Sequence, residues 1–112
     1  MDGITVKNEI RKGAAVVTIS GRVDSATAEA LEEQLAKIAR ENSRMVLDMH
    51  EVTYLSSAGV RAIVTTLQSV HKAGGGILLA NVSDAVERVL DTVGMLHLLR
   101  SFRTVDDALR SL

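Results

Sequence analysis

Two adjacent serines, Ser56 and Ser57, occupy the position in this sequence that best suits chemistry or regulation. They lie between a short apolar run at residues 45–49 and a segment, residues 60–70, whose apolar side chains recur every three or four positions. This pattern predicts a buried strand followed by an amphipathic helix. A hydroxyl at a helix start can accept a hydrogen bond from a free backbone N–H, and a phosphate there would face the positive end of the helix dipole. The turn at residues 54–59 is therefore the candidate functional site, and the residues alone leave a capping role and a regulatory role open for either serine.

Catalysis by these serines is not indicated. Nucleophilic catalysis needs a neighbouring base, and His50, His71 and His97 stand far apart in sequence. No G-x-S-x-G elbow surrounds Ser57. The histidines show no metal-ligand spacing and the chain contains no cysteine. We therefore predict no catalytic residue, no metal site and no cofactor, and we expect a protein that is not an enzyme.

Three charged residues lie near the predicted turn in sequence or topology. Asp24 and Asp48 fall where predicted strands end, so they either cap and terminate those elements or, as a pair, repel or orient an incoming phosphate. Arg61 lies one helical turn after Ser57 and off the apolar stripe formed by Val60, Ile63, Val64, Leu67 and Val70. It is either a solvated charge or a residue that steers a partner or pairs with a phosphate.

The elements that must position these residues follow from periodicity and from turn residues. Strands are predicted at residues 4–10, 14–20, 45–49, 77–80 and 98–102. Helices are predicted at residues 26–40, with Asp24 or Ser25 as N-cap, and from 60 to a stop at residues 74–76. Two more are predicted, one capped by Ser83-Asp84 and ended by Gly94, and one capped by Thr104.

This order, β-β-α-β-α-β-α-β-α, predicts an α/β fold in one domain that spans residues 1–112. A mostly parallel sheet should follow an N-terminal β-hairpin, with the helices packed mainly on one side. Sites in such sheets gather at the carboxyl ends of strands, so the segments at residues 21–25 and 53–59 should converge.

Composition narrows the classes of partner. The 112 residues are 46% hydrophobic and 24% charged with a formal net charge of −1. Because the charges are interspersed and aromatic residues make up only 2%, we expect neither direct nucleic-acid binding nor a polybasic membrane surface. No apolar run approaches the length of a membrane span and the N-terminus does not read as a signal peptide, so we expect a cytoplasmic protein.

The motif Tyr54-Leu55-Ser56-Ser57-Ala58-Gly59-Val60 resembles the signature of STAS domains, in particular the bacterial anti-sigma factor antagonists. Gly21-Arg22-Val23-Asp24 resembles the family's Gly-x-hydrophobic-Asp segment. The strand at residues 46–49 and the glycines at 74–76 followed by residues 77–81 match further parts of the family pattern, so the resemblance extends over essentially the whole chain.

The resemblance implies specific roles for residues of the turn. The family's turn is typically Asp-Ser-Ser/Thr-Gly, and its first serine accepts a phosphate. On this chain Ser57 takes the acceptor position, Ser56 replaces the Asp, and Ala58 replaces the second hydroxyl residue. The partner-binding residues implied are Asp24, Ser56, Ser57, Ala58, Gly59 and Arg61.

The function implied is partner switching. The unmodified domain would bind an anti-sigma factor that is also a serine kinase, phosphorylation of Ser57 would release it, and a PP2C-like phosphatase would restore the binding form. Two alternatives remain at this point: a STAS scaffold that regulates a signalling partner unrelated to sigma factors, and a nucleotide-binding module suggested only by the strand-to-helix turn.

Overall fold

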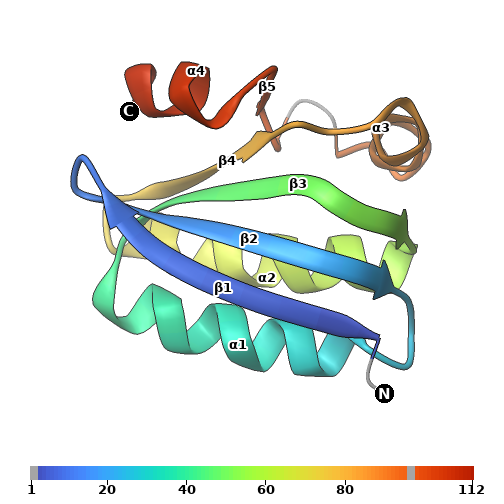
Figure 1. Ribbon diagram of the computed structural model, residues 1–112. Helices are drawn as coiled ribbons and strands as arrows, with labels where there is room; N and C mark the ends of the chain where they lie inside the picture. The colour runs from blue at the N-terminus through green and yellow to red at the C-terminus, as the bar shows by residue number, and fades with distance from the viewer. Residues whose placement is uncertain (1–2, 96–97) are drawn as a thin grey trace.

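The computed structural model describes residues 3–95 and 98–112, and within them it contains five strands and four helices in the predicted order (Figure 1). His97 lies outside the described residues. The elements are β1 (Ile4–Arg11), β2 (Ala14–Val23), α1 (Ala28–Glu41), β3 (Arg44–Leu55), α2 (Ser57–Lys72), β4 (Gly76–Ala80), α3 (Asp84–Thr92), β5 (Ser101–Phe102) and α4 (Val105–Arg110).

The strands form one sheet in the order β1-β2-β3-β4-β5. β1 pairs with β2 antiparallel, and each later neighbour pairs in parallel. Lys12 and Gly13 form the two-residue hairpin loop with φ values of 52° and 78°, a left-handed conformation that suits the twist of a hairpin. The predicted α/β fold with an N-terminal hairpin and an otherwise parallel sheet is confirmed.

The helices cover the two faces of the sheet unequally. α1 and α2 lie side by side under one face (Figure 1), and buried residues of α3 join the same apolar cluster as theirs. α4 lies on the opposite face, where Ala108 and Leu109 pack against Val16, Val46 and Leu78. The prediction that the helices pack mainly on one side is therefore confirmed, with α4 as the exception.

The buried face of α2 is displaced from the predicted apolar stripe. Ile63 and Val70 are buried as expected, whereas Leu67 is only half-buried. Thr66 is buried instead. Its hydroxyl is satisfied there, because it donates to the carbonyl oxygen of Ala62 at 3.0 Å. A polar side chain can lie inside a helix interface when it satisfies its own hydrogen bond in this way.

Several predicted boundaries were wrong. β2 continues to Val23 instead of ending at residue 20. β3 continues to Leu55, because the end of β2 extends beside it and pairs Val23 with Leu55. β5 is restricted to Ser101–Phe102, since the backbone N–H groups of Leu98 and Leu99 donate to the Met95 carbonyl in a turn.

A further correction concerns the start of α1. The N-cap is Thr27, not Asp24 or Ser25. Asp24 instead closes the turn that precedes the helix, because its side chain accepts from the backbone N–H groups of Ala26 and Thr27.

Within the described residues, no helix combines the length and apolar character that crossing a membrane requires.

Candidate functional site

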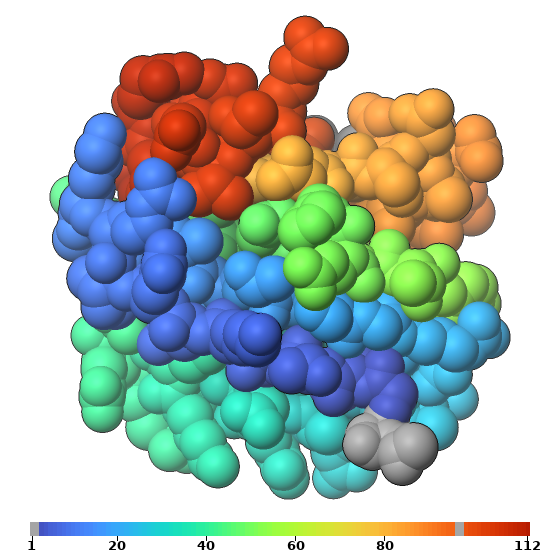
Figure 2. All heavy atoms as spheres, viewed as in Figure 1, coloured from blue at the N-terminus to red at the C-terminus, as the bar shows by residue number. Residues whose placement is uncertain are grey.

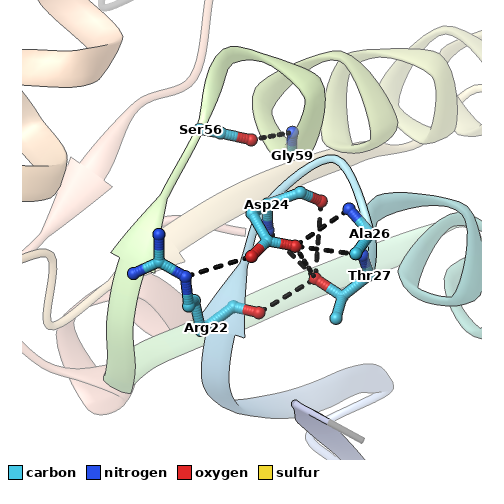
Figure 3. Close-up of polar contacts among 6 residues, drawn as sticks. All are labelled: Arg22, Asp24, Ala26, Thr27, Ser56 and Gly59. Carbon is cyan, nitrogen blue, oxygen red and sulfur yellow. Dashed lines mark hydrogen bonds and ion pairs between the residues drawn. The ribbon is translucent and has the colours of Figure 1, made fainter.

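The two serines have different positions at the start of α2. Ser56 is the N-cap, and its Oγ accepts a hydrogen bond from the backbone N–H of Gly59 at 3.3 Å (Figure 3). Ser57 is the first residue of the helix and is exposed. The capping role therefore belongs to Ser56, which leaves the hydroxyl of Ser57 accessible at the positive end of the helix.

The ends of β2 and β3 meet at this turn. Val23 and Leu55 are neighbours in the parallel register, and the backbone N–H of Ser56 donates to the Val23 carbonyl at 2.8 Å. Asp24, the next residue after β2, consequently lies beside the serine turn (Figure 3). The predicted convergence of the two segments is confirmed.

Gly59 allows the start of α2 to approach both strands closely. It is buried, and a Cβ atom added there would lie 2.5 Å from Val23 Cγ1 and 2.7 Å from Leu55 Cδ1. No other residue fits this space without displacing its neighbours. Gly59 therefore lies behind the accessible surface and positions it, whereas Ala58 is half-buried at its margin.

Asp24 is held as a carboxylate by its neighbours. Its Oδ1 accepts from the backbone N–H of Ala26 at 2.9 Å and of Thr27 at 3.2 Å, and its Oδ2 pairs with Arg22 Nε at 3.0 Å. Partial burial acts to raise the pKa of Asp24, but the hydrogen bonds from Ala26, Arg22 and Thr27 together outweigh it and lower the pKa below 3.8. The carboxylate of Asp24 is therefore ionised at neutral pH and paired with the Arg22 guanidinium.

Arg22 and Tyr54 form a second feature of the site. The two residues are neighbours in the β2–β3 register, and the guanidinium carbon of Arg22 lies 4.1 Å from the centre of the Tyr54 ring. This cation–π contact and the ion pair to Asp24 hold the guanidinium in one place. Sequence reasoning assigned neither residue a role. Their separate motifs offered no sign of contact, because only the extension of β2 and β3 makes them adjacent.

An open groove of about 530 Å³ runs from the serine turn to α3. Tyr54, Leu55, Ser56 and Ser57 form one wall. The other wall is α3 with its C-cap residue; α3 contributes Ala85, Arg88, Val89 and Thr92, and the C-cap is Val93. Sequence reasoning missed α3 as part of the site, since an exposed Arg88 on an amphipathic helix resembles an ordinary solvated charge.

Asp48 and His50 lie elsewhere, and the prediction that Asp48 faces the site was wrong. Asp48 is in the middle of β3, where its Oδ1 accepts from Asn81 Nδ2 at 3.0 Å and from the backbone N–H of His50 at 3.2 Å. β3 continues to Leu55, and at about 3.3 Å per residue the strand places Ser57 on the order of 20 Å from Asp48.

His50 lies beside two acidic residues of β3, Asp48 and Glu51. Its ring nitrogens lie 3.6 Å from oxygens of Asp48 and of Glu51. The part of the chain that the structure describes contains no cluster of three or more histidine or acidic residues that could hold a metal ion. Arg61 is exposed on α2 one helical turn beyond Ser57, where the sequence placed it.

The fold and the turn are those of a known class. Residues 5–108 match the STAS domain family, and the chain belongs to that family. The anti-sigma-F factor antagonist RsfB of Mycobacterium tuberculosis is 31% identical over 109 residues, which cover 96% of this chain and 88% of that protein. The resemblance drawn from the motifs is confirmed.

Solved structures agree with this assignment. An anti-sigma factor antagonist from Mycobacterium paratuberculosis matches with a TM-score of 0.87 at 30% identity, over 98% of this chain and 94% of that one. The phosphorylated form of SpoIIAA, a Bacillus cell fate determinant, matches with a TM-score of 0.71 over 96% of this chain and 98% of that one. At 14% identity, the second likeness shows the fold alone.

Proposed function

We propose that this protein is an anti-sigma factor antagonist that acts by partner switching. With Ser57 unmodified, it binds an anti-sigma factor that is also a serine kinase. Phosphorylation of Ser57 releases that partner, and a PP2C-like phosphatase restores the binding form. The protein is then a binding module and a kinase substrate, not an enzyme, and it acts in the cytoplasm. The names of its relatives support the antagonist role.

The observation that carries the proposal is the division of roles between the serines. Because Ser56 Oγ caps α2, modification of Ser57 leaves the cap in place. A phosphate on Ser57 would add a charge of about −1.5 to −2 at the helix N-terminus, where the backbone tolerates it. Phosphorylated Ser57 is therefore compatible with the fold. Release then requires only that the partner surface bind the phosphorylated form more weakly.

The rejection is electrostatic and steric. A partner fitted to a small neutral hydroxyl would meet a larger, charged group beside the ionised Asp24. A hundredfold loss of affinity corresponds to about 2.7 kcal/mol, which one poorly matched interfacial charge can supply.

We assign the partner surface to the accessible residues around the turn. Asp24, Ser56, Ser57 and Ala58 form its centre, and Arg61 lies on the adjoining turn of α2. Gly59 contributes indirectly, by holding the start of the helix against β2 and β3. Arg61 steers an acidic partner, so Arg61→Ala should slow association and weaken its dependence on salt while leaving the fold intact.

The test begins with capture of the partner. The Ser57→Ala protein, immobilised, should retain an anti-sigma factor from an extract of the organism that encodes it, and Ser57→Asp should retain much less. Ser69→Asp is the matched control, because it adds the same charge to an exposed serine of the same helix and should bind like the parent. Incubation of the captured kinase with ATP and the parent protein, followed by peptide mapping, should place phosphate on Ser57.

Several outcomes would count against the proposal. Phosphate on Ser56 or on the Ser57→Ala protein would refute the acceptor assignment. Equal affinity of the Ala and Asp variants would refute the charge switch. Capture of a signalling protein unrelated to sigma factors would support the alternative STAS scaffold instead, and saturable nucleotide binding would support the nucleotide-binding module.

A further inference from the structure

β1 is an edge strand whose outer side is uncovered. Among the described residues it pairs only with β2, and Figure 2 shows it lying open on the face turned to the viewer. It is eight residues long, whereas the opposite edge of the sheet, β5, has two. A long edge strand is a template for pairing with another strand, unless its side chains prevent it.

The hydrogen-bond pattern shows which residues of β1 face outward. The backbone N–H of Arg22 donates to the Gly3 carbonyl at 2.9 Å, so these two residues form a hydrogen-bonded pair. Because such pairs alternate in an antiparallel ladder, Thr5, Lys7 and Glu9 also direct both backbone groups toward β2. The N–H and C=O groups of Ile4, Val6, Asn8 and Ile10 therefore point away from the sheet.

The side chains along this edge alternate in character. Val6 packs against the core on the face covered by α1, and Ile10, on the same face, is 58% exposed. Lys7 and Glu9 are exposed on the opposite face. An apolar pair and an oppositely charged pair thus flank Asn8 in a symmetric arrangement.

We propose that β1 pairs antiparallel with β1 of a second copy of this chain, with Asn8 on the two-fold axis. In this register Lys7 lies opposite Glu9 of the partner copy, and Val6 lies opposite its Ile10. The symmetry makes each contact twice. Val6, Asn8 and Ile10 then form the hydrogen-bonded pairs, which are the pairs that their outward backbone groups permit.

The charges select this register over its neighbours. With the axis moved to Lys7, that residue would lie opposite its own copy, and with the axis at Glu9 two carboxylates would face each other. Like charges directly opposite are destabilising. An axis between two residues would set outward-facing backbone groups against inward-facing ones, and the ladder could not form. The edge is therefore self-complementary at Asn8.

The dimer leaves the serine turn accessible. Asn8 pairs with Val17, while Ser56 follows the far end of β2 beside Val23. Six residues of strand separate Val17 from Val23, on the order of 20 Å. Each dimer would present two separate copies of the groove, so self-association and the proposed partner switching are independent.

Charge reversal tests the register directly. By sedimentation over a range of concentrations, the parent should show a reversible monomer–dimer equilibrium. Lys7→Glu and Glu9→Lys should each raise the dimer dissociation constant at least tenfold, because each places two pairs of like charges opposite each other. The double variant Lys7→Glu/Glu9→Lys should recover dimerisation. Lys37→Glu, at an exposed site on α1, is the matched control and should behave as the parent.

Mixing the single variants gives the sharpest result. The Lys7→Glu protein has glutamate at positions 7 and 9, and the Glu9→Lys protein has lysine at both. Opposite charges therefore face each other only in the mixed dimer, so an equimolar mixture should form heterodimers although neither protein dimerises alone. Asn8→Pro should also abolish dimerisation, since the N–H that it removes points away from β2. A parent that stays monomeric at millimolar concentration, dimers that survive both single reversals, or a mixture that stays monomeric would each overturn the proposal.

Discussion

At the scale of single residues, the site separates a structural hydroxyl from an accessible one. The Oγ of Ser56 accepts a hydrogen bond from the backbone N–H of Gly59 and caps α2. Ser57, the next residue, does not serve as the cap. A cap contributes about 1 kcal/mol to helix stability. Ser57→Ala should therefore disturb the fold less than Ser56→Ala, and the two variants can separate binding effects from folding effects.

The charge of Asp24 makes a prediction about pH. Its pKa is lower in the folded protein than the usual 3.8, so ionised Asp24 favours folding above pH 3.8, and this contribution is lost as the pH falls through the lowered pKa. Asp24→Asn should accordingly be less stable than the parent near neutral pH, and the difference should shrink on acidification. Urea unfolding of both proteins at several pH values measures it. A difference that stays constant, or that grows in acid, would show that the hydrogen bonds do not favour the charged form.

The resemblance to the family, and not the residues alone, singled out Ser57 as the proposed acceptor. The strand-to-helix turn and the loop-facing carboxylate of Asp24 could be predicted because both have local signatures. Arg22, Tyr54 and Arg88 could not, since their contacts depend on how far β2 and β3 extend and on where α3 packs. Asp48 was misplaced for the same reason, because its strand continues well beyond it.

At the scale of elements, the junction of α2 with β2 and β3 depends on a missing side chain. Gly59→Ala would place a Cβ against Val23 and Leu55, and such overpacking should cost about 1–3 kcal/mol of unfolding free energy. This outweighs the gain in helix propensity that alanine brings. Denaturant unfolding is the measurement.

Gly76→Ala is the matched control for that substitution. A Cβ at Gly76 would meet nothing within 4 Å, so the replacement should leave stability unchanged or raise it by about 0.4–1 kcal/mol through the unfolded state. If both alanine variants were equally stable, the close approach at Gly59 would not limit the packing of α2.

Element boundaries were the least predictable part of the structure. The caps Ser83 and Thr104 were recognised from local sequence and are confirmed by their hydrogen bonds to Val86 and Asp107. The ends of β3 and β5 were not, because they depend on pairing with a neighbouring strand and on insertion of Leu99 into the core. Local signals fix how a helix begins, whereas tertiary contacts decide where a strand ends.

At the scale of the whole molecule, α2 contributes to the core through Ile63 more than through Leu67. Ile63 is fully buried and Leu67 is half-buried. Ile63→Ala should therefore cost about 2–5 kcal/mol of unfolding free energy, and Leu67→Ala distinctly less. Chemical denaturation of the two variants compares them. Equal losses would mean that the buried face of α2 is centred nearer the stripe that periodicity suggested.

The global fold was predictable because many weak signals agreed. The alternation of strand and helix, the apolar strands and the single hairpin turn all specify one topology, and each independently excludes many others. The position of α4 on the opposite face was not foreseen. Its apolar stripe shows that one side is buried but does not say against which face of the sheet. Val16, Val46 and Leu78 provide that face, and α4 buries them.

The residues of one wall of the groove beside Ser57 are needed for packing of the core, whereas the exposed residues of the other wall are not. The wall made by β3 and α2 is tied to the core through Leu55, Gly59 and the contact with Val23. On α3, by contrast, Ala85, Arg88 and Thr92 are exposed and face the groove, while Val86 and Leu90 anchor the helix from its other side. Under the proposed function, duplicates of this domain could therefore differ in α3 and discriminate between related partners, while Ser57 and the folding core stay the same.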